Sequence, residues 1–589
     1  MIHRKLTLSF RPAAGLLLAA FLAAVGSSPA ARAQQLKTAR LLPEKTAVLL
    51  WFPNAPEAAE RFMNTALGRI GRDPQIRPLV DQFRESLSAS MESEEKGIGL
   101  SLSELLALPQ GELTLAVVAP EKGGPALVVL VDTGDQVADA RKLLDRMSHG
   151  TGRREVNIFD TRIVVQEGSV AGQQQLMFLE KEGTLVVSTN MEVLKQMLAA
   201  WNGQELPTIG GNKKFGAIMR RSREQNPRPQ FVWYVDPILL LRSMGERNPS
   251  LQMGLAMFPV LGLDGVRAFG GGIEWDTGRF DSMTHVHLLL TRPDTGILKV
   301  LALRSGETTP EGWVPADVST YTTMHWDLLA AFTALREVFD GFRGEGALSK
   351  ALQQWVGEPT GLDFENDLLP ALTGRMTRIT RVDRPGTPRG RSTLFAWELK
   401  PGSGLDAVLE TIARDRGEAL SRLSHSGKTY YQFSSPTSEA DASARRALPR
   451  PYFGVLDNCL IVADRESLYQ TVIDTAAGSG DRLADALDFK LVASRIRDRS
   501  GGAEPAMVRF ARPEEDMRSF YELVGADQTR GLLSRQAERN TFSRALHSAV
   551  GGDSLPPFSV LESYLAPGGG LLTVDEEGIH YTGITLRRK

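Results

Sequence analysis

The feature that most constrains the fold of this 589-residue chain is an internal repeat at a spacing of about 275 positions. Four pairs of residues or segments match within one position of that spacing, which unrelated stretches of sequence rarely do. The matched pairs are residues 185–188 with 460–463, Phe215 with Phe489, Pro229 with Pro505, and Pro237 with Pro513. A repeat of this length predicts two domain-sized copies of one fold.

The spacing drifts outside this block, as insertions in surface loops would make it drift. Gly111, for example, matches Gly374 at a spacing of 263. We therefore expect the first copy over residues 41–290 and the second copy over 313–586. Residues 303–312 lie between them and are rich in small and polar side chains, which is typical of a linker.

Within each copy, short apolar strands alternate with helices whose apolar residues recur at helical spacing. In the first copy, strand 47–52 is expected to lead into a helix capped by Asn54, and residues 112–118 and 126–131 are expected to form a hairpin. Strands joined by short turns pair antiparallel, whereas parallel neighbours need a crossover connection. The sequence therefore predicts an α+β fold with two related copies of an antiparallel or mixed sheet packed with helices.

Three apolar segments give specific expectations about secondary structure or burial. Residues 158–165 are expected to form one strand. One buried helix face is expected from Leu348, Leu352, Trp355 and Val356. A second apolar set is expected in the core, with a groove for a lipid or a partner peptide as the alternative: Leu251, Met253, Leu255, Met257, Phe258, Val260 and Leu261.

The first 33 residues have the three parts of a secretory signal peptide. Basic residues precede an apolar run at 13–25, and the small residues Ala31 and Ala33 come directly before a cleavage point. The apolar run is shorter than the ~20 residues of a membrane-spanning helix. We expect an exported protein, periplasmic or secreted after cleavage following Ala33, with no transmembrane segment in the mature chain. A signal peptide retained as an anchor is the alternative.

Charge and cysteine content restrict the class of partner and the chemistry. The formal net charge is −2 and becomes −6 without residues 1–33, because these contain four basic residues and no acid. Such a charge gives the whole molecule no attraction for nucleic acid. The single cysteine, Cys459, cannot form an internal disulfide, and its apolar neighbours predict that it fills the core.

Short motifs recur in both copies. The first copy carries 42–46 (LPEKT), 99–106 (GLSLSELL) and 111–116 (GELTLA), and the second carries 361–369 (GLDFENDLL) and Gly374. Together these motifs resemble an uncharacterised family of exported bacterial proteins that is catalogued as a domain of unknown function. The resemblance covers most of the chain after the signal and implies no catalytic residue, because the family has no assigned active site. The second copy departs from the pattern after Gly374, where Arg375 replaces an acidic or apolar residue.

Motifs of known enzyme classes fail on spacing or on the comparison of the copies. Asp132 begins an Asp-Thr-Gly turn like those that supply the paired carboxylates of aspartic proteases, but the second copy has Lys400-Pro401-Gly402 opposite it. Gly427-Lys428-Thr429 lacks the leading glycine of a phosphate-binding loop. The sequence thus predicts no cofactor and no catalytic residue. It favours a non-enzymatic binding or structural protein of the envelope; a hydrolase with an active site between the two copies is the alternative.

Two histidines raise the question of a metal site. His285 and His287 lie two positions apart on a predicted strand, so their imidazoles face the same side. No third ligand is evident, and at a spacing of 300 the second copy has Thr585 and Arg587. We therefore expect histidines that face solvent and no metal, with a metal site as the alternative.

One segment is strongly basic. Six arginines of the second copy fall within 17 residues that contain one acid, Asp383: Arg375, Arg378, Arg381, Arg384, Arg389 and Arg391. The corresponding segment of the first copy, residues 112–125, has no such cluster. We expect this hairpin to contact an anionic partner such as an anionic polymer of the envelope; another envelope protein is the alternative partner.

Overall fold

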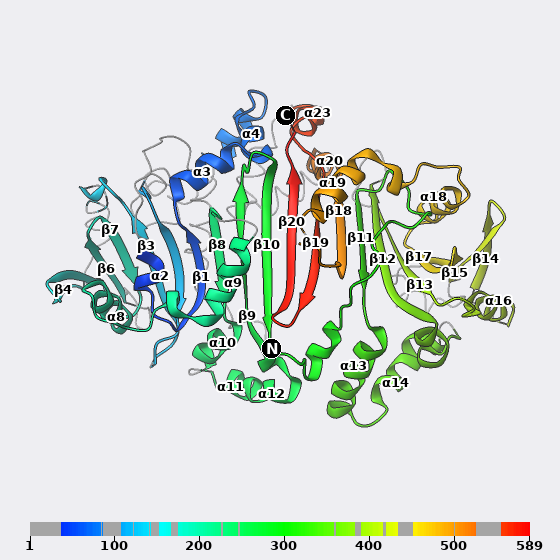
Figure 1. Cartoon of the computed structure of the whole chain (residues 1–589), viewed down its shortest axis with the longest axis horizontal. Coiled ribbons are helices and arrows are strands. Elements are labelled where there is room, and N and C mark those ends of the chain that lie inside the picture. Colours follow the sequence, from blue (N-terminus) through cyan, green and yellow to red (C-terminus); the bar gives the residue numbers. More distant parts are fainter. Residues whose placement is uncertain are drawn as a thin grey trace.

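A single antiparallel sheet runs through the whole molecule. The computed structural model describes residues 37–83, 85, 108–121, 123–138, 140, 142, 152–166, 175–224, 228–245, 248–358, 361–382, 390–415, 420–433, 451–499, 501–525 and 555–588. Twenty strands within these residues form one sheet (Figure 1). The α+β class that the sequence predicts is confirmed. The signal-like residues 1–33 and the motif at 99–106 lie outside the described residues.

The first half of the sheet has the strand order β4-β5-β6-β7-β3-β2-β1-β8-β9-β10, with all neighbours antiparallel. Its strands are β1 (Thr46–Phe52), β2 (Leu113–Val118), β3 (Ala126–Asp132), β4 (Arg153–Ile158), β5 (Thr161–Gln166), β6 (Leu176–Lys181), β7 (Thr184–Ser188), β8 (Phe231–Val235), β9 (Val266–Trp275) and β10 (Phe280–Leu290).

The second half has the order β14-β15-β16-β17-β13-β12-β11-β18-β19-β20, so each strand occupies the place of the strand numbered ten lower. Its strands are β11 (Thr320–His325), β12 (Leu372–Val382), β13 (Arg391–Leu399), β14 (Leu420–His425), β15 (Lys428–Phe433), β16 (Tyr452–Leu456), β17 (Cys459–Ala463), β18 (Met507–Ala511), β19 (Gly568–Asp575) and β20 (Gly578–Leu586). The halves meet where β10 pairs with β20 at the centre of the sheet (Figure 1).

The two halves also share their register. In the first half Leu50 of β1 lies between Leu115 and Trp233, and in the second half Thr322 of β11 lies between Arg378 and Arg509. Following the pairing outward from these strands brings Val187 and Val462 to corresponding positions, which is the spacing of 275 found in the sequence. Common ancestry of the two halves stays a prediction, and an identical order and register is what it would produce.

Four helices cover one face of the sheet, which we call the helical face: α8 (Met191–Trp201), α9 (Lys213–Glu224), α18 (Glu466–Ala476) and α19 (Leu487–Arg497). Glycines allow α9 and α19 to approach the strands closely. A Cβ atom on Gly270 of β9 would lie 3.1 Å from Cδ1 of Ile218, and one on Gly569 of β19 would lie 2.7 Å from Cδ1 of Ile496. Each half thus places a glycine beneath the helix that flanks the central joint.

Most of the remaining helices lie along the ends of the strands or over the opposite face, whereas α2 (Lys37–Leu41) packs against α8. Figure 1 shows one group of helices at one end of the strands: α3 (Ala55–Met63), α4 (Ala66–Arg72), α20 (Pro513–Gly525) and α23 (Phe558–Glu562). It shows a second group at the other end of the strands: α10 (Pro237–Gly245), α11 (Pro249–Ala256), α12 (Phe258–Leu261), α13 (Leu328–Arg343) and α14 (Ala347–Leu352). The short α2 (Lys37–Leu41) precedes β1, and α16 (Leu405–Asp415) packs beside β14 and β16.

The main hydrophobic cores lie between the sheet and the four helices that cover its helical face. The core of the first half includes Trp51 and Leu194, and the core of the second half includes Tyr321 and Ile461. Cys459 belongs to the second core, as the sequence predicts, and burial raises the pKa of its thiol to about 12. The thiolate is therefore scarce at neutral pH, and the residue acts as an apolar filler.

Local signals in the first copy are confirmed where the chain makes its own turn or cap. The Asn54 side chain accepts a hydrogen bond from the Glu57 amide at 3.1 Å and begins α3. The predicted hairpin forms from β2 and β3. The single strand expected over 158–165 is wrong, because Phe159 and Asp160 adopt left-handed φ angles of 50° and 56° and fold the segment into the β4–β5 hairpin.

Two expectations about burial are wrong. No residue of α11 or α12 is buried, and Met253 and Val260 are 74% and 68% exposed, because these helices lie along an edge of the sheet rather than over a face. In the second half Leu348 is buried, but Trp355 is 66% exposed. A π-helical turn at Gln353–Gly357 continues α14 and turns Trp355 away from the face that Leu348 occupies.

The expected linker, residues 303–312, is held against the second half. The Ser305 hydroxyl donates to the Glu504 carbonyl at 2.9 Å, and the Gly306 amide donates to the Pro505 carbonyl at 3.3 Å. Near its end, Glu311 lies against Arg375 of β12 at 3.1 Å. The segment is therefore an ordered part of the second half rather than a free tether.

Among the described residues, none of the helices combines the length and the apolar character that a membrane crossing requires.

Candidate functional site

The six arginines singled out by the sequence do not form one surface. Arg384 and Arg389 lie outside the described residues. Arg375 is only 8% exposed, with its Nε 3.1 Å from Oε1 of Glu311, so it is a buried ion-pair partner and not a surface contact. Arg391 pairs with Asp516 at 2.9 Å. Arg381 lies on the helical face, where it donates to the Thr471 hydroxyl of α18 at 2.8 Å.

Arg378 lies on the other side of the sheet, because alternate residues of a strand point to opposite faces. Ile379 of β12 contributes to the core under α18 and α19, so Arg378 points away from these helices and is exposed. Its guanidinium lies 5.8 Å from the ring centre of Phe395 on β13, which is a cation–π distance. Thr322 and then Arg509 follow in the same register on β11 and β18.

We call this surface the arginine face and define it by Thr322, Arg378, Phe395 and Arg509. Arg509 is exposed, and neither it nor Arg378 forms an ion pair with any described carboxylate. The strands β11, β12, β13 and β18 contain one acid, Glu398, whose neighbours in register place it on the helical side. Two guanidinium groups that form no ion pair with the described carboxylates give this face a local positive potential, although the chain as a whole is slightly negative.

A shallow hollow of about 250 Å³ adjoins Arg509 at the central joint. Hydroxyl-bearing side chains and glycines dominate its lining: Ser282, Thr284, Tyr581, Thr585, Gly568, Gly569 and Gly583, together with Arg509, Ala511, Pro513 and Ile584. The Tyr581 side chain lies flat over two glycines. A Cβ atom on Gly570 would be 2.4 Å from the tyrosine hydroxyl, and one on Gly583 would be 3.0 Å from the ring. Only glycine leaves room for this arrangement.

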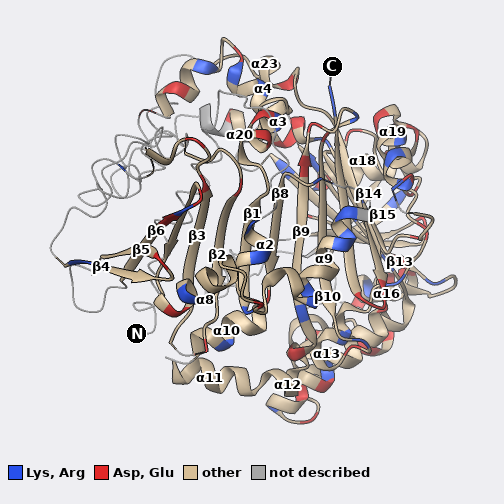
Figure 2. Cartoon of the chain, turned by 60° about the vertical axis from the view of Figure 1, so that its left-hand side comes forward, with Lys and Arg blue, Asp and Glu red and all other residues tan. Residues whose placement is uncertain are grey.

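The first half has apolar residues at the corresponding positions. Leu115 takes the place of Arg378, Trp233 that of Arg509, and Val129 that of Phe395. In Figure 2 the strands β1, β2 and β8 of the first half are uniformly tan, in agreement with their sequences, which contain no charged residue. The arginine face is therefore particular to the second half.

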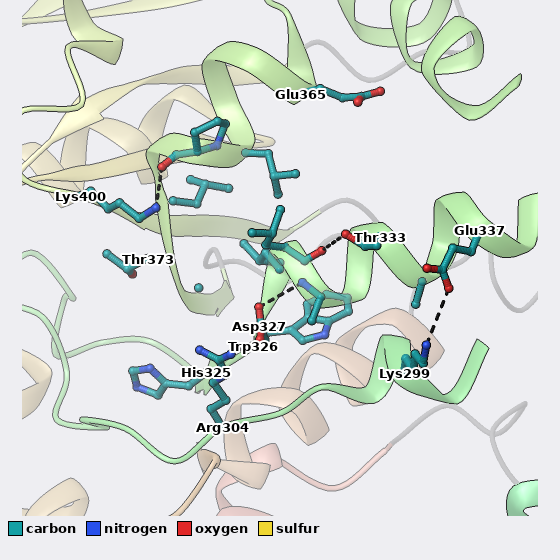
Figure 3. A pocket seen from close by; sticks show the side chains of 18 of the residues that line it. Lys299, Arg304, His325, Trp326, Asp327, Thr333, Glu337, Glu365, Thr373 and Lys400 are labelled. Atoms are coloured by element: carbon teal, nitrogen blue, oxygen red, sulfur yellow. Dashed lines mark hydrogen bonds and ion pairs between the residues drawn. The ribbon is translucent and has the colours of Figure 1, made fainter. Parts of the chain in front are cut away.

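A larger pocket of about 920 Å³ surrounds the first turns of α13 (Figure 3). In Figure 3 Lys400, Thr373, Arg304 and His325 lie around the N-terminal end of the helix, whereas Glu337, a residue of the helix, and Lys299 lie further along it. Arg304 pairs with Asp327, and Lys299 lies 3.7 Å from Glu337. The cations of this pocket are thus largely matched by carboxylates; Lys400 instead donates to the Pro370 carbonyl at 2.8 Å.

Candidate nucleophiles and bases in this pocket bind main-chain carbonyls rather than each other. The Ser305 hydroxyl donates to Glu504, the Thr333 hydroxyl donates to Leu329, and Nε2 of His325 lies 2.6 Å from the Glu307 carbonyl. Nucleophilic catalysis requires the nucleophile within hydrogen-bond reach of its base. These three side chains do not provide such a pair.

The two histidines of β10 are buried, so the expectation that they face solvent is wrong. His285 and His287 are 2% and 4% exposed, because β10 is the central strand and this side of it lies beneath α9 and α19. Their rings stack at 6.2 Å. The register also corrects the spacing between corresponding residues of β10 and β20. Gly271 and Gly570 correspond, and they pair with Val286 and Gly583, so the spacing on these strands is 297 rather than the 300 assumed from the sequence.

A chain of hydrogen bonds leads from the surface to His287. Arg221 of α9 pairs with Asp575, Asp575 lies 2.9 Å from Nε2 of His580, and Nδ1 of His580 lies 3.2 Å from Nδ1 of His287. The Nε2 atoms of His285 and His287 are buried and have no hydrogen-bond partner among the described residues.

Burial keeps both histidines of β10 neutral. Desolvation, with the charge of Arg499, lowers the pKa of His285 to about 4. Desolvation, followed by the charges of His580, His285 and Arg221, lowers the pKa of His287 to about 3. In the part of the chain that the structure describes, no cluster of three or more His, Cys, Asp or Glu side chains is suited to a metal ion.

Arg509 was not among the predicted site residues, although the sequence contains a signal for it. The repeat aligns 231–234 (FVWY) with 507–510 (MVRF), which puts an arginine opposite Trp233 in an otherwise apolar strand. The glycine triplets at 270–272 and 568–570 were not predicted to matter either; they permit the approach of α9 and α19 and the flat placement of Tyr581.

Comparison with known proteins gives no match to a family model, to a curated protein or to a solved structure.

Proposed function

We propose that the chain is an exported, non-enzymatic binding protein of the envelope, whose second half binds an anionic partner on the arginine face. One observation carries the proposal: Arg378 and Arg509 are exposed without a carboxylate partner among the described residues, where the first half has Leu115 and Trp233. The shared fold does not need these charges, since the other half forms the same strands without them.

The strength of such a site limits the kind of partner. An exposed ion pair contributes ~0.2–1 kcal/mol, so two arginines contribute at most about 2 kcal/mol. A single small anion would therefore bind weakly. A polymer that offers many charges can gain affinity by repeated engagement, which favours an anionic polymer over a simple ion.

The signal-like residues support the expected envelope location, and the hydrogen bonds in the larger pocket support a non-enzymatic role. Residues 1–33 have the features of a signal peptide, so the partner is expected among the polymers of the envelope rather than among nucleic acids. In the pocket around α13, Ser305, Thr333 and His325 are engaged by main-chain carbonyls. That arrangement favours binding over hydrolysis in this pocket.

Affinity for immobilised dextran sulfate at low and high salt tests the proposal. The informative variant is Arg378→Leu/Arg509→Trp, which installs the residues of the first half. The matched control is Arg223→Leu/Arg242→Trp, which removes two exposed charges from α9 and α10.

We expect the first variant to bind up to ~30-fold more weakly at low salt, the factor that corresponds to about 2 kcal/mol. The control variant should bind about as tightly as wild type, and high salt should weaken binding by all three proteins. Equal binding by the two variants, each with an unchanged circular dichroism spectrum, would reject the arginine face as the site.

A further inference from the structure

The arginine face and the adjoining hollow together identify a class of anionic partner. We propose that the partner is an acidic polysaccharide, with its carboxylates bound by Arg378 and Arg509 and its sugar rings resting on Tyr581 and Phe395. This inference rests on the proposed function and adds the chemistry of the ligand.

The separation of the two arginines is the first argument. They lie in register two strands apart, on either side of Thr322, which places their backbones about 9.5 Å from each other at the usual strand spacing. In a polyuronate such as polygalacturonate every sugar carries a carboxylate, and two carboxylates that are two sugars apart offer widely spaced charges of this kind. Nucleic acid is less suitable, because each strand of the duplex carries one charge per ~3.4 Å of helix axis, a charge density that suits denser clusters of cations.

The aromatic side chains are the second argument. Tyr581 lies flat over Gly570 and Gly583, and Phe395 is 36% exposed beside Trp397, whose ring is 6.1 Å away and nearly parallel. The apolar C–H face of a pyranose ring packs against such aromatic surfaces. The first half has Thr284 and Val129 at the positions of Tyr581 and Phe395, so these two aromatic side chains are particular to the same half as the arginines.

The hollow is the third argument. It joins Arg509 to the hydroxyls of Ser282, Thr284 and Thr585 and to the ring of Tyr581. A sugar presents several hydroxyl groups and, when it is a uronic acid, one carboxylate. The lining therefore offers a cation for the carboxylate and hydroxyl partners for the remaining oxygens. An acidic peptide could use the arginines but has no comparable use for the flat tyrosine and the hydroxyls.

Binding should be measured by isothermal titration with four polymers: polygalacturonate, polyglutamate, single-stranded DNA and neutral dextran. The protein variants are wild type, Tyr581→Thr, Arg378→Leu/Arg509→Trp and the control Arg223→Leu/Arg242→Trp. Tyr581→Thr installs the residue that the first half has at this position and leaves every charge in place.

We expect wild type to bind polygalacturonate more tightly than polyglutamate or DNA. Tyr581→Thr should weaken polygalacturonate binding by about 2- to 10-fold, the range expected for one aromatic contact, and leave polyglutamate binding unchanged. The double arginine variant should weaken the binding of every anion.

The outcomes separate the two proposals. If polyglutamate or DNA binds as tightly as polygalacturonate and Tyr581→Thr has no effect, the polysaccharide is rejected and the anionic partner stands. Binding of neutral dextran equal to that of polygalacturonate would reject the role of the arginines. If no anion binds, or if the arginine variant binds every anion like wild type, both proposals fall.

Discussion

The two halves of the sheet have the same strand order and register, yet they differ in chemistry on the face away from α18 and α19. The first half has Leu115 and Trp233 where the second half has Arg378 and Arg509. Strand pairing depends on the backbone, and a residue on one face can change while the core on the other face is kept. The comparison teaches that the shared residues maintain the sheet, whereas the divergent face is the place to look for function.

A second difference between the halves is buried. Glu112 in the first half accepts hydrogen bonds from the Lys37 amide at 2.6 Å and the Trp51 indole at 3.0 Å. At the corresponding position of the second half, Arg375 pairs with Glu311 and donates to the Thr309 carbonyl at 2.5 Å. Both side chains hold the segment that leads into the first strand of their half, with opposite charge. A buried charge is thus tolerated in either sign when its partners change with it.

The largest expected effect lies at the joint between the halves and concerns pH. In the unfolded chain His285 and His287 take up protons near pH 6.5, whereas in the folded protein their pKa values are about 4 and about 3. The stability that depends on their neutral form is present above pH 6.5 and is lost as the pH falls. Each group contributes about 1.4 kcal/mol per pH unit, so up to ~5 kcal/mol is lost between pH 6.5 and 4.5.

The matched variant is His285→Thr/His287→Ile, which installs the residues found at Thr582 and Ile584. Urea unfolding at pH 6.5, 5.5 and 4.5 should show a shallower loss of stability for the variant than for wild type. Other groups near the joint, including Asp575, Arg221 and Arg499, are present in both proteins and cancel in this difference. Parallel pH profiles would contradict the prediction.

The next effect sharpens the comparison of the two buried charges. Arg375→Met leaves the Glu311 carboxylate buried without its partner and should lower the free energy of unfolding by ~3–5 kcal/mol. Glu112→Gln keeps an acceptor for the Lys37 amide and should cost less, about 1–3 kcal/mol. Urea titration at pH 7 measures both. Equal losses of unfolding free energy in the two variants would contradict this expected difference between the two buried charges.

A smaller effect tests whether the glycines beneath α9 and α19 are equivalent. At either glycine an added Cβ would lie 2.5 Å from a main-chain carbonyl of the neighbouring strand, and at Gly569 it would also meet Cδ1 of Ile496 at 2.7 Å and Cγ1 of Val492 at 2.8 Å, so Gly569→Ala should cost about 1–3 kcal/mol. Gly270→Ala should cost less, because its nearest side-chain atom, in Ile218, is 3.1 Å away. Gly211→Ala, with open space around its Cβ, serves as the control. If Gly569→Ala leaves the free energy of unfolding unchanged, α19 can shift to make room for the added methyl group.

The smallest effect compares the caps of corresponding helices. Asn54 caps α3 and Asp327 caps α13, each through a hydrogen bond of 3.1 Å from a main-chain amide. Asn54→Ala should cost ~1 kcal/mol. Asp327→Ala should cost somewhat more, because the side chain also pairs with Arg304. Thermal unfolding of the two variants measures the difference, and a larger loss for Asn54→Ala would contradict it.

Part of the candidate site could be predicted from the sequence. Arg378 was among the arginines that the sequence singled out, and it does belong to the arginine face. Arg509 was not, because it is distant in the chain and its nearness to Arg378 arises only when β18 and β12 pair with β11. The burial of His285 and His287 was likewise hidden, because it depends on the pairing of β10 with β20 at the joint.

By itself the sequence determined the α+β class, the hairpin of β2 and β3 and the cap at Asn54, because strand periodicity, short turns and helix caps are local properties of the chain. Only the tertiary structure decided that the two halves form one continuous sheet and which side each arginine takes. Arg375 and Arg378 are three positions apart, yet strand alternation puts one in a buried ion pair with Glu311 and the other on the exposed face beside Phe395. The physical reason is that a strand has two sides, and only packing against α18 and α19 decides which side is buried.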